Sequence, residues 1–600
     1  MCLNGQWEFE IDQADSGFER GVLERALRDQ ITVPFAPESA LSGIGAVDFL
    51  EAVWYRRRVT IPARWENMRV LLHFEAVDHD ATVWVNNVEA GRHRGGFSGF
   101  TVDISPFVAA GEHAEIVVRA RDTHHGPQAR GKQSTRLLGY EALYPRTTGI
   151  WQTVWLEPVP EVHLGRPRIT PHVDGGRLGI DIPVSRNAPG FVCRVVVSDA
   201  AGEVAASQVG IDRDRSAQLV ISLPPERQRL WSPADPHLYD VVLQLLDAGG
   251  RVIDEARSYA GLRSITIDGT AVLINGAPVF QRLVLDQGWY PDGLMTAPTD
   301  AALVRDIELG REAGFVGARL HQKVFEERYL YHADRLGYLV WAEFGDWGCN
   351  VGGPGDNQRA DAAYITQWLE VLERDYSHPS IIGWCPLNET FQTIHDHITA
   401  LDDVARGMFL ATKAMDLTRP VLDASGYSHR VRASDIYDSH SYEQNPERFA
   451  EQMAGLASGA PYVNAAPDGA AWSIPYAGQP YFCSEFGGIW WSTGDQSGKD
   501  LWSYGEAPAT EQEWYDRFRG LVEVLAGNPL MFGYCFTQLT DVFQERNGLY
   551  RFDRSTKLDV ARVKQIQSRT AAFESWQPDV SADQADSGLL QGAPPGRPLQ

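Results

Sequence analysis

The chain has 600 residues, of which 44% are hydrophobic and 22% charged, and its formal net charge at pH 7 is −25. This is the composition of a globular protein, and the length suggests about four domains, or fewer if one of them is a large barrel. The negative charge repels phosphate backbones, and no apolar run reaches the roughly 18 residues of a membrane span. We therefore expect neither nucleic acid nor a membrane as a partner.

The N-terminus and the cysteines bear on localisation. The first residues lack a basic segment followed by an apolar one, so we expect no signal peptide. The six cysteines show no CxxC motif and no zinc-ligand spacing. We therefore expect reduced, mostly buried thiols in a cytoplasmic protein.

The first 264 residues are predicted to form β-structure only. Residues 1–160 consist of short segments of alternating polar and apolar residues, such as 53–61 and 81–85, with turn residues between them. This pattern is typical of an all-β sandwich. Residues 161–264 contain further short strands and no helical stretch, which favours an immunoglobulin-like sandwich. Cys193 has no evident partner in this segment, so no bridging disulfide is expected.

After residue 265 the hydrophobic pattern changes to alternating strands and helices. We predict helices over 300–313 and 326–336, and strands over 314–320 and 338–343. Because this alternation continues to about residue 552, residues 265–580 suit one (β/α)8 barrel. The remaining residues, 581–600, are rich in Gly, Pro and Ser, and we predict a disordered tail there.

Two glutamates stand in the setting that a glycosidase requires. In residues 378–389 and 479–488, a short apolar run that suits a buried strand leads to a polar residue and then to Glu389 or Glu485. Catalytic side chains of a (β/α)8 barrel lie at the C-terminal ends of its strands. Two carboxyls facing each other there can cleave a glycosidic bond. The pair therefore predicts a glycoside hydrolase.

Together these motifs resemble glycoside hydrolase family 2, which includes β-galactosidases, β-glucuronidases and β-mannosidases. The resemblance covers nearly the whole chain. It implies a jelly-roll sugar-binding-like domain over 1–160, an immunoglobulin-like domain over 161–264 and a catalytic TIM barrel over 265–580. Besides the two glutamate segments, the resemblance is carried by residues 77–86, 95–97 and 149–152.

The resemblance also implies roles for five residues of the barrel. Glu389 is expected to be the acid/base and Glu485 the nucleophile of a retaining, exo-acting double displacement. Asn388 is expected to bind the sugar 2-hydroxyl, and Arg319 and Tyr442 to contact the nucleophile. Such a guanidinium would hold the carboxylate ionised and oriented.

Further candidates for the pocket are residues that come directly after predicted strands and aromatic residues near predicted strand ends. Phe536 stands where the family often has a tryptophan beneath the sugar. The other candidates for substrate binding are His321, Gln322, Lys323, Asp286, Trp289 and Trp491. The basic loop 130–136 could reach over the pocket, although a solvated loop is the interpretation that we favour.

Two motifs of family members are absent from this sequence, and their absence limits the range of expected substrates and metals. Glucuronidases of this type carry an Asn-x-Lys motif that grips the substrate carboxylate, whereas residues 546–550 read Arg-Asn-Gly-Leu-Tyr. Lys323 or Arg546 would have to serve instead. Metal-dependent β-galactosidases have a Glu-x-His ligand pair where this chain has residues 343–347, so we predict no essential magnesium and no cofactor.

We therefore predict a three-domain, β-galactosidase-like enzyme that releases a terminal sugar from an oligosaccharide or glycoside. Galactofuranosyl and L-arabinosyl substrates remain open. A β-glucuronidase is the alternative activity, and a catalytically inactive carbohydrate-binding protein is the alternative class. The resemblance also implies a possible homo-oligomer, a dimer or tetramer.

Overall fold

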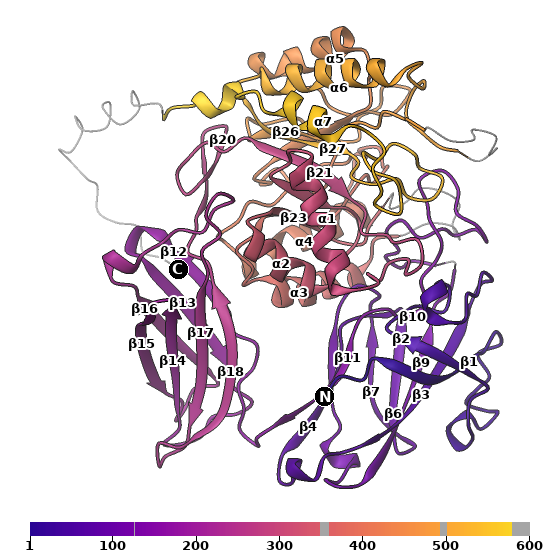
Figure 1. Ribbon diagram of the computed structural model, residues 1–600, viewed down its shortest axis with the longest axis vertical. Coiled ribbons are helices and arrows are strands. Elements are labelled where there is room, and N and C mark those ends of the chain that lie inside the picture. The colour runs from indigo at the N-terminus through magenta and orange to yellow at the C-terminus, as the bar shows by residue number, and fades with distance from the viewer. Residues whose placement is uncertain (125, 348–358, 493–500, 579–600) are drawn as a thin grey trace.

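The computed structural model describes residues 1–124, 126–347, 359–492 and 501–578 (Figure 1). The tail predicted over 581–600 lies outside these residues. Two β-sandwiches lie below a larger unit of strands and helices, as Figure 1 shows. Among the described residues, no helix has both the length and the apolar character needed to cross a membrane.

The N-terminal sandwich packs a six-stranded sheet against smaller ones. Alternate residues of each strand enter the core, as in β4 (Arg69–Phe74), where every second side chain is buried. The large sheet has the order β2 (Asp29–Val33), β1 (Gly5–Ile11), β3 (Ala52–Thr60), β9 (His113–Arg121), β6 (Asp80–Val85) and β7 (Val88–Arg94). The facing strands are β11 (Val154–Val159), β4 and β8 (Phe100–Asp103), with the short pair β10 (Gly149–Ile150) and β5 (Val77–Asp78).

The second sandwich consists of a three-stranded and a four-stranded antiparallel sheet. Its sheets are β12 (Arg168–His172), β13 (Arg177–Pro183) and β16 (Ser216–Ser222), and β15 (Gly202–Gly210), β14 (Val192–Asp199), β17 (Tyr239–Leu246) and β18 (Val252–Ala260). Cys193 is a buried free thiol in β14, as predicted. The two sandwiches fall on either side of residue 160, and we keep 160 and 264 as proposed domain boundaries.

The third unit is a parallel barrel with helices outside it. A hairpin of β19 (Ile265–Asp268) and β20 (Ala271–Ile274) precedes it. Its seven assigned strands have the order β24 (Ile381–Cys385), β23 (Leu339–Glu343), β22 (Gly317–Leu320), β21 (Gln281–Asp286), β27 (Met531–Thr537), β26 (Tyr481–Gly487) and β25 (Tyr437–Ser441).

An eighth strand position closes this barrel between β24 and β25. Trp384 pairs in parallel with Val421, and Asn388 with Ser425. On the other side, the Asp435 N–H donates to the Val421 carbonyl at 3.0 Å. The predicted fold of two sandwiches and a (β/α)8 barrel is thus confirmed.

The barrel helices follow from local sequence signals. Thr299 caps α1 (Asp300–Glu312) by accepting from the Ala302 N–H, and Gly337 ends α2 (Glu327–Leu336) in a left-handed conformation, φ 68°. The predicted helices thus agree with α1 and α2 within one residue. The other helices are α3 (Ala362–Asp375), α4 (Ala400–Met415), α5 (Pro446–Met453), α6 (Glu511–Ala526) and α7 (Val560–Gln567).

Candidate active site

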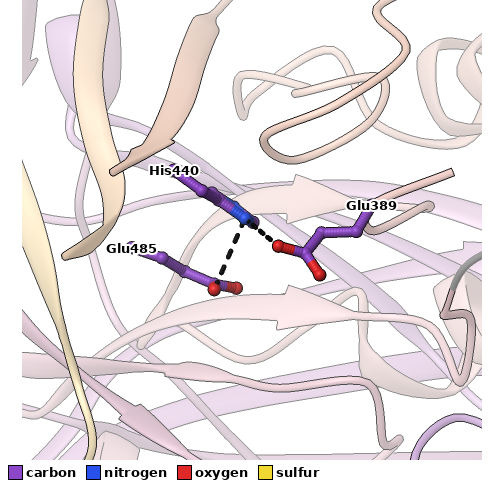
Figure 2. A group of neighbouring side chains, drawn as sticks. All are labelled: Glu389, His440 and Glu485. Atoms are coloured by element: carbon purple, nitrogen blue, oxygen red, sulfur yellow. Dashed lines mark hydrogen bonds and ion pairs between the residues drawn. The ribbon is translucent and has the colours of Figure 1, made fainter. Parts of the chain in front are cut away.

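Glu389 and Glu485 meet at the C-terminal end of the barrel. Glu389 follows β24 and Glu485 lies near the end of β26. One oxygen of each carboxyl and a ring nitrogen of His440 all lie within 4.8 Å of one another (Figure 2). The Glu389 side chain is 12% exposed and that of Glu485 only 3%, so both carboxyls are largely removed from bulk water.

His440 lies between the two carboxyls (Figure 2). Its Nδ1 is 2.5 Å from Glu389 Oε1 and 3.4 Å from Glu485 Oε2, and its Nε2 is 2.9 Å from Ser425 Oγ. Sequence reasoning did not single out this histidine. The signal was present, because side chains two residues apart in a strand share a face, and Tyr442 was already a candidate.

Glu389 and His440 each shift the pKa of the other. Burial opposes ionisation of Glu389, but the charge and hydrogen bond of His440 outweigh it and lower the pKa of that carboxyl. Burial likewise lowers the pKa of His440, but the charges of Glu485 and Glu389 outweigh it, so the pKa is raised above the ordinary 6.5. In the free protein, the shared proton therefore resides mainly on His440.

Arg319 is fully buried and anchors the nucleophile candidate. Its Nη2 donates to Glu485 Oε1 at 2.7 Å and to Asn388 Oδ1 at 2.8 Å, and its Nε donates to Glu343. Burial disfavours its charge, but Glu343 and Glu485 outweigh burial and raise the pKa of Arg319. The guanidinium thus stays charged and fixes one face of the Glu485 carboxylate.

Replacing Arg319 by glutamine should destabilise the barrel, because Glu343 and Glu485 would lose their buried cation. Breaking a buried pair in this way costs about 3–5 kcal/mol. Scanning calorimetry should therefore show a clearly lower Tm. Arg305→Gln is the control, because its ion pair with Glu312 is about half exposed, and such pairs contribute roughly 0–1 kcal/mol. Equal Tm values for the two variants would contradict the role of Arg319.

Two further predicted residues lie at the carboxyl pair. Tyr442 donates its hydroxyl hydrogen to Glu485 Oε2 and stacks on Tyr504, with ring centroids 3.4 Å apart. The Asn388 amide nitrogen, Nδ2, is buried and has no hydrogen-bond partner. A donor left in this state beside the two carboxyls is available to a substrate hydroxyl.

His321 and Gln322 complete the wall beside Glu485. His321 Nε2 lies 3.8 Å from Glu485 Oε1, and Gln322 Nε2 lies 2.9 Å from the same ring nitrogen. Gln322 and Glu389 both have positive φ, 52° and 46°. Such backbone strain in non-glycine residues concentrates at functional sites.

Four of the predicted residues have side chains that are engaged with other groups of the protein. Lys323 Nζ donates to the carbonyls of Gly288 and Met295, at 2.8 and 2.6 Å, and lies 3.3 Å from Glu326. Asp286 accepts from the Gly288 N–H and the Tyr329 hydroxyl. Neither side chain is free to bind a sugar.

The aromatic candidates Trp289 and Phe536 both pack against other rings, and their roles stay predictions. Trp289 is buried edge-to-face against Tyr144, with centroids 5.2 Å apart. Phe536 is fully buried and packs on Phe518 of α6, so it points to the helix layer and not into the barrel mouth. Trp491 is partly buried, and its indole nitrogen has no hydrogen-bond partner, so it stays a prediction.

The basic loop of the first sandwich is buried against the barrel, contrary to the solvated loop that we favoured. Arg130, Lys132 and Gln133 are each 2–5% exposed. The Gly131 N–H donates to the Gly345 carbonyl at 2.7 Å, which joins the loop to the segment after β23.

Glu389, His440 and Glu485 place their donor atoms close enough together to share a metal ion. Among the described residues, no other group of three or more His, Cys, Asp or Glu side chains does so. Glu343, at the position compared with the magnesium ligands, instead accepts from Arg319 and from the Gln322 N–H at 3.0 Å. A carboxylate already bonded to a guanidinium is poorly suited to a second cation.

Family models match three parts of the chain. Residues 46–127 match the sugar binding domain of glycosyl hydrolases family 2, and residues 322–467 match the TIM barrel domain of that family. Residues 162–263 match the model described as glycosyl hydrolases family 2. The chain belongs to glycosyl hydrolase family 2. It is accordingly an enzyme that hydrolyses O-glycosyl bonds.

Individual family 2 proteins are similar over most of the chain. The β-glucuronidase of Paenibacillus borealis is 27% identical over 417 residues, 65% of this chain and 68% of that protein. The mouse β-glucuronidase is 26% identical over 458 residues, 70% of this chain and 67% of that one. A β-galactosidase of Thermoanaerobacter pseudethanolicus is 23% identical over 464 residues, 74% and 56% of the two chains.

Solved structures show the same fold. The β-glucuronidase from Ruminococcus gnavus in complex with D-glucuronic acid superimposes with a TM-score of 0.75. The match covers 95% of this chain and 97% of that one at 20% identity. The arrangement of two sandwiches and a barrel is therefore shared over nearly the whole chain.

Proposed function

We propose that this enzyme releases a terminal non-reducing sugar with retention of configuration, with Glu485 as nucleophile and Glu389 as acid/base. The separation of the two carboxyls carries the proposal. Carboxyls about 5–5.5 Å apart serve retaining enzymes, whereas inverting enzymes need about 6.5–9.5 Å to admit a water. Oxygens within 4.8 Å of each other favour the retaining geometry.

The reaction has two displacements. Glu485, ionised and held by Arg319 and Tyr442, attacks the anomeric carbon. A glycosyl ester forms, the bond to the leaving oxygen breaks, and that oxygen takes a proton from Glu389. A water then gives its proton to Glu389 and attacks the anomeric carbon, which releases the sugar and restores the Glu485 carboxylate.

His440 explains how Glu389 obtains the proton that it donates. The charge of Glu485 is one of the two that raise the pKa of His440. As the ester forms, this charge is consumed, so His440 becomes a stronger acid. The proton then moves along the 2.5 Å contact to Glu389 as the leaving oxygen needs it.

The names of the similar proteins support two substrate classes, β-glucuronides and β-galactosides. Those described above are named β-glucuronidase or β-galactosidase. Their names give no support to the galactofuranosyl and L-arabinosyl substrates, which we do not propose. A complete pair of carboxyls with its supporting side chains also argues against an inactive binding protein.

A panel of p-nitrophenyl β-glycosides tests the proposal, with glucuronide and galactoside as the main members. Proton NMR of the first product of the cleaved substrate should show the β-anomer before mutarotation. Initial appearance of the α-anomer would overturn the retaining mechanism. Absence of turnover on every member would overturn the proposed substrates.

A further inference from the structure

The first sandwich contributes a lysine to the wall of the active site. Its loop 130–133 packs so closely on the barrel that a side chain at Gly131, where φ is 55°, would collide with the Gln322 carbonyl. The next residue, Lys132, is 5% exposed. The loop thus lies directly against the βα loop that carries His321 and Gln322.

The Lys132 ammonium has aromatic rings as neighbours but no counter-ion. Its Nζ lies 4.9 Å from the centroid of the Trp347 ring and 5.8 Å from that of Tyr144. Within the described parts of the chain, no carboxylate lies within ion-pair distance of it. Aromatic faces hold a cation in place, but burying a charge without an anionic partner is costly.

The other buried cations near the site are already paired. Arg319 binds Glu343 and Glu485. Lys323, which we had considered for a substrate carboxylate, binds two carbonyls and Glu326. Arg546, the second candidate, is 38% exposed and lies 4.0 Å from Asp541. Lys132 is therefore the cation best placed to accept an anion from a ligand.

Trp347 connects this cation to the acid/base candidate. One face of its ring lies against Lys132, while its Nε1 donates to Glu389 Oε2 at 2.8 Å. In agreement with this proximity, the Lys132 charge acts on both Glu389 and His321. The ammonium thus lies beside the space in which the sugar must sit.

The segment 546–550, which we compared with the Asn-x-Lys motif, also lies close to Lys132. Asn547 donates to Glu545 at 3.2 Å, and Glu545 accepts from the hydroxyl of Tyr144, whose ring neighbours Lys132. Barrel and sandwich thus meet here through a hydrogen-bonded chain of side chains. Lys132 therefore lies one ring away from the Glu545 carboxyl to which Asn547 donates.

We propose that Lys132 binds the carboxylate of a uronic acid, which makes β-uronides the substrate class of this enzyme. The inference rests on the retaining mechanism proposed above. Without Lys132, a uronate would face the carboxyls of Glu389 and Glu485 and be repelled. With it, the ligand supplies the missing counter-ion, and a charge-assisted hydrogen bond forms in a site largely closed to water.

The test compares substrates that differ only at C6. We expect the wild type to prefer p-nitrophenyl β-D-glucuronide over the β-D-glucoside. Lys132→Met keeps the apolar stem and removes the charge. It should lower kcat/KM on the glucuronide about 10- to 100-fold more than on the glucoside. Lys132→Arg should recover part of the loss, and Arg546→Gln is the matched control for a neighbouring cation.

The results of this test distinguish a failure of the Lys132 role from a failure of the retaining mechanism. Equal losses of Lys132→Met on both substrates, or a wild type indifferent to the carboxylate, would overturn the role of Lys132 and leave the mechanism standing. Calorimetry of D-glucuronate binding to Glu485→Gln protein gives a reading without turnover. Adding Lys132→Met should weaken this binding by a similar factor, and unchanged binding would overturn the inference.

Discussion

Glu485→Gln should lower kcat/KM by about 10⁴- to 10⁶-fold, the order of loss seen when single catalytic-triad residues are removed from a serine protease. An amide cannot form the glycosyl ester, so the first displacement has no nucleophile. The fold should persist, because glutamine keeps the shape, its carbonyl oxygen can still accept from Arg319, and its NH2 group can donate to the Tyr442 hydroxyl oxygen. Initial rates on the preferred aryl glycoside measure the loss, and circular dichroism checks the fold.

Glu443→Gln is the matched control for this variant. Glu443 immediately follows Tyr442 and is half-buried, and one of its oxygens accepts from the Asn445 N–H. Its replacement should leave kcat/KM nearly unchanged. Trapping with a 2-fluoro glycoside should also label the wild type in the peptide that contains Glu485. A label on another residue, or a Glu485→Gln variant near wild-type activity, would refute the assignment.

Much of the fold could be predicted because its signals are local. Hydrophobic period separated the sandwiches from the barrel, and capping residues such as Thr299 and Gly337 delimit helices. The contact between loop 130–133 and the barrel has no such signal. Its basic residues look like a solvated loop in sequence, and their burial arises from packing between domains far apart along the chain.

Some residues of the candidate site could likewise be predicted from the sequence, and others could not. Glu389, Glu485 and Arg319 could be predicted because a strand end in a barrel locates its side chains. Lys323 was misplaced because the positive φ of Gln322 breaks the alternation that would have carried it to the face of Arg319 and His321. His440 and Lys132 needed the assembled structure, since their partners lie on other strands or another domain.

Glu389→Gln should give a loss that depends on the leaving group. General acid catalysis contributes about 10²- to 10⁴-fold, so a substrate with a poor leaving group, such as a methyl glycoside, should lose that much in kcat/KM. A 2,4-dinitrophenyl glycoside departs without a proton and should lose far less. A plot of log kcat/KM against leaving-group pKa should therefore be steeper than for the wild type, and equal losses along the series would contradict the acid role.

The pH dependence gives an independent test of the same residue. The active wild type carries one proton in the Glu389–His440 pair, and rising pH removes it. Because the pKa of His440 is raised above 6.5, the fall in kcat/KM on the alkaline side should begin above that value. In Glu389→Gln no acid donates, so the alkaline fall should largely disappear for the dinitrophenyl substrate. A variant that keeps the wild-type alkaline limb would assign that proton to another group, and the relay through His440 would fail with it.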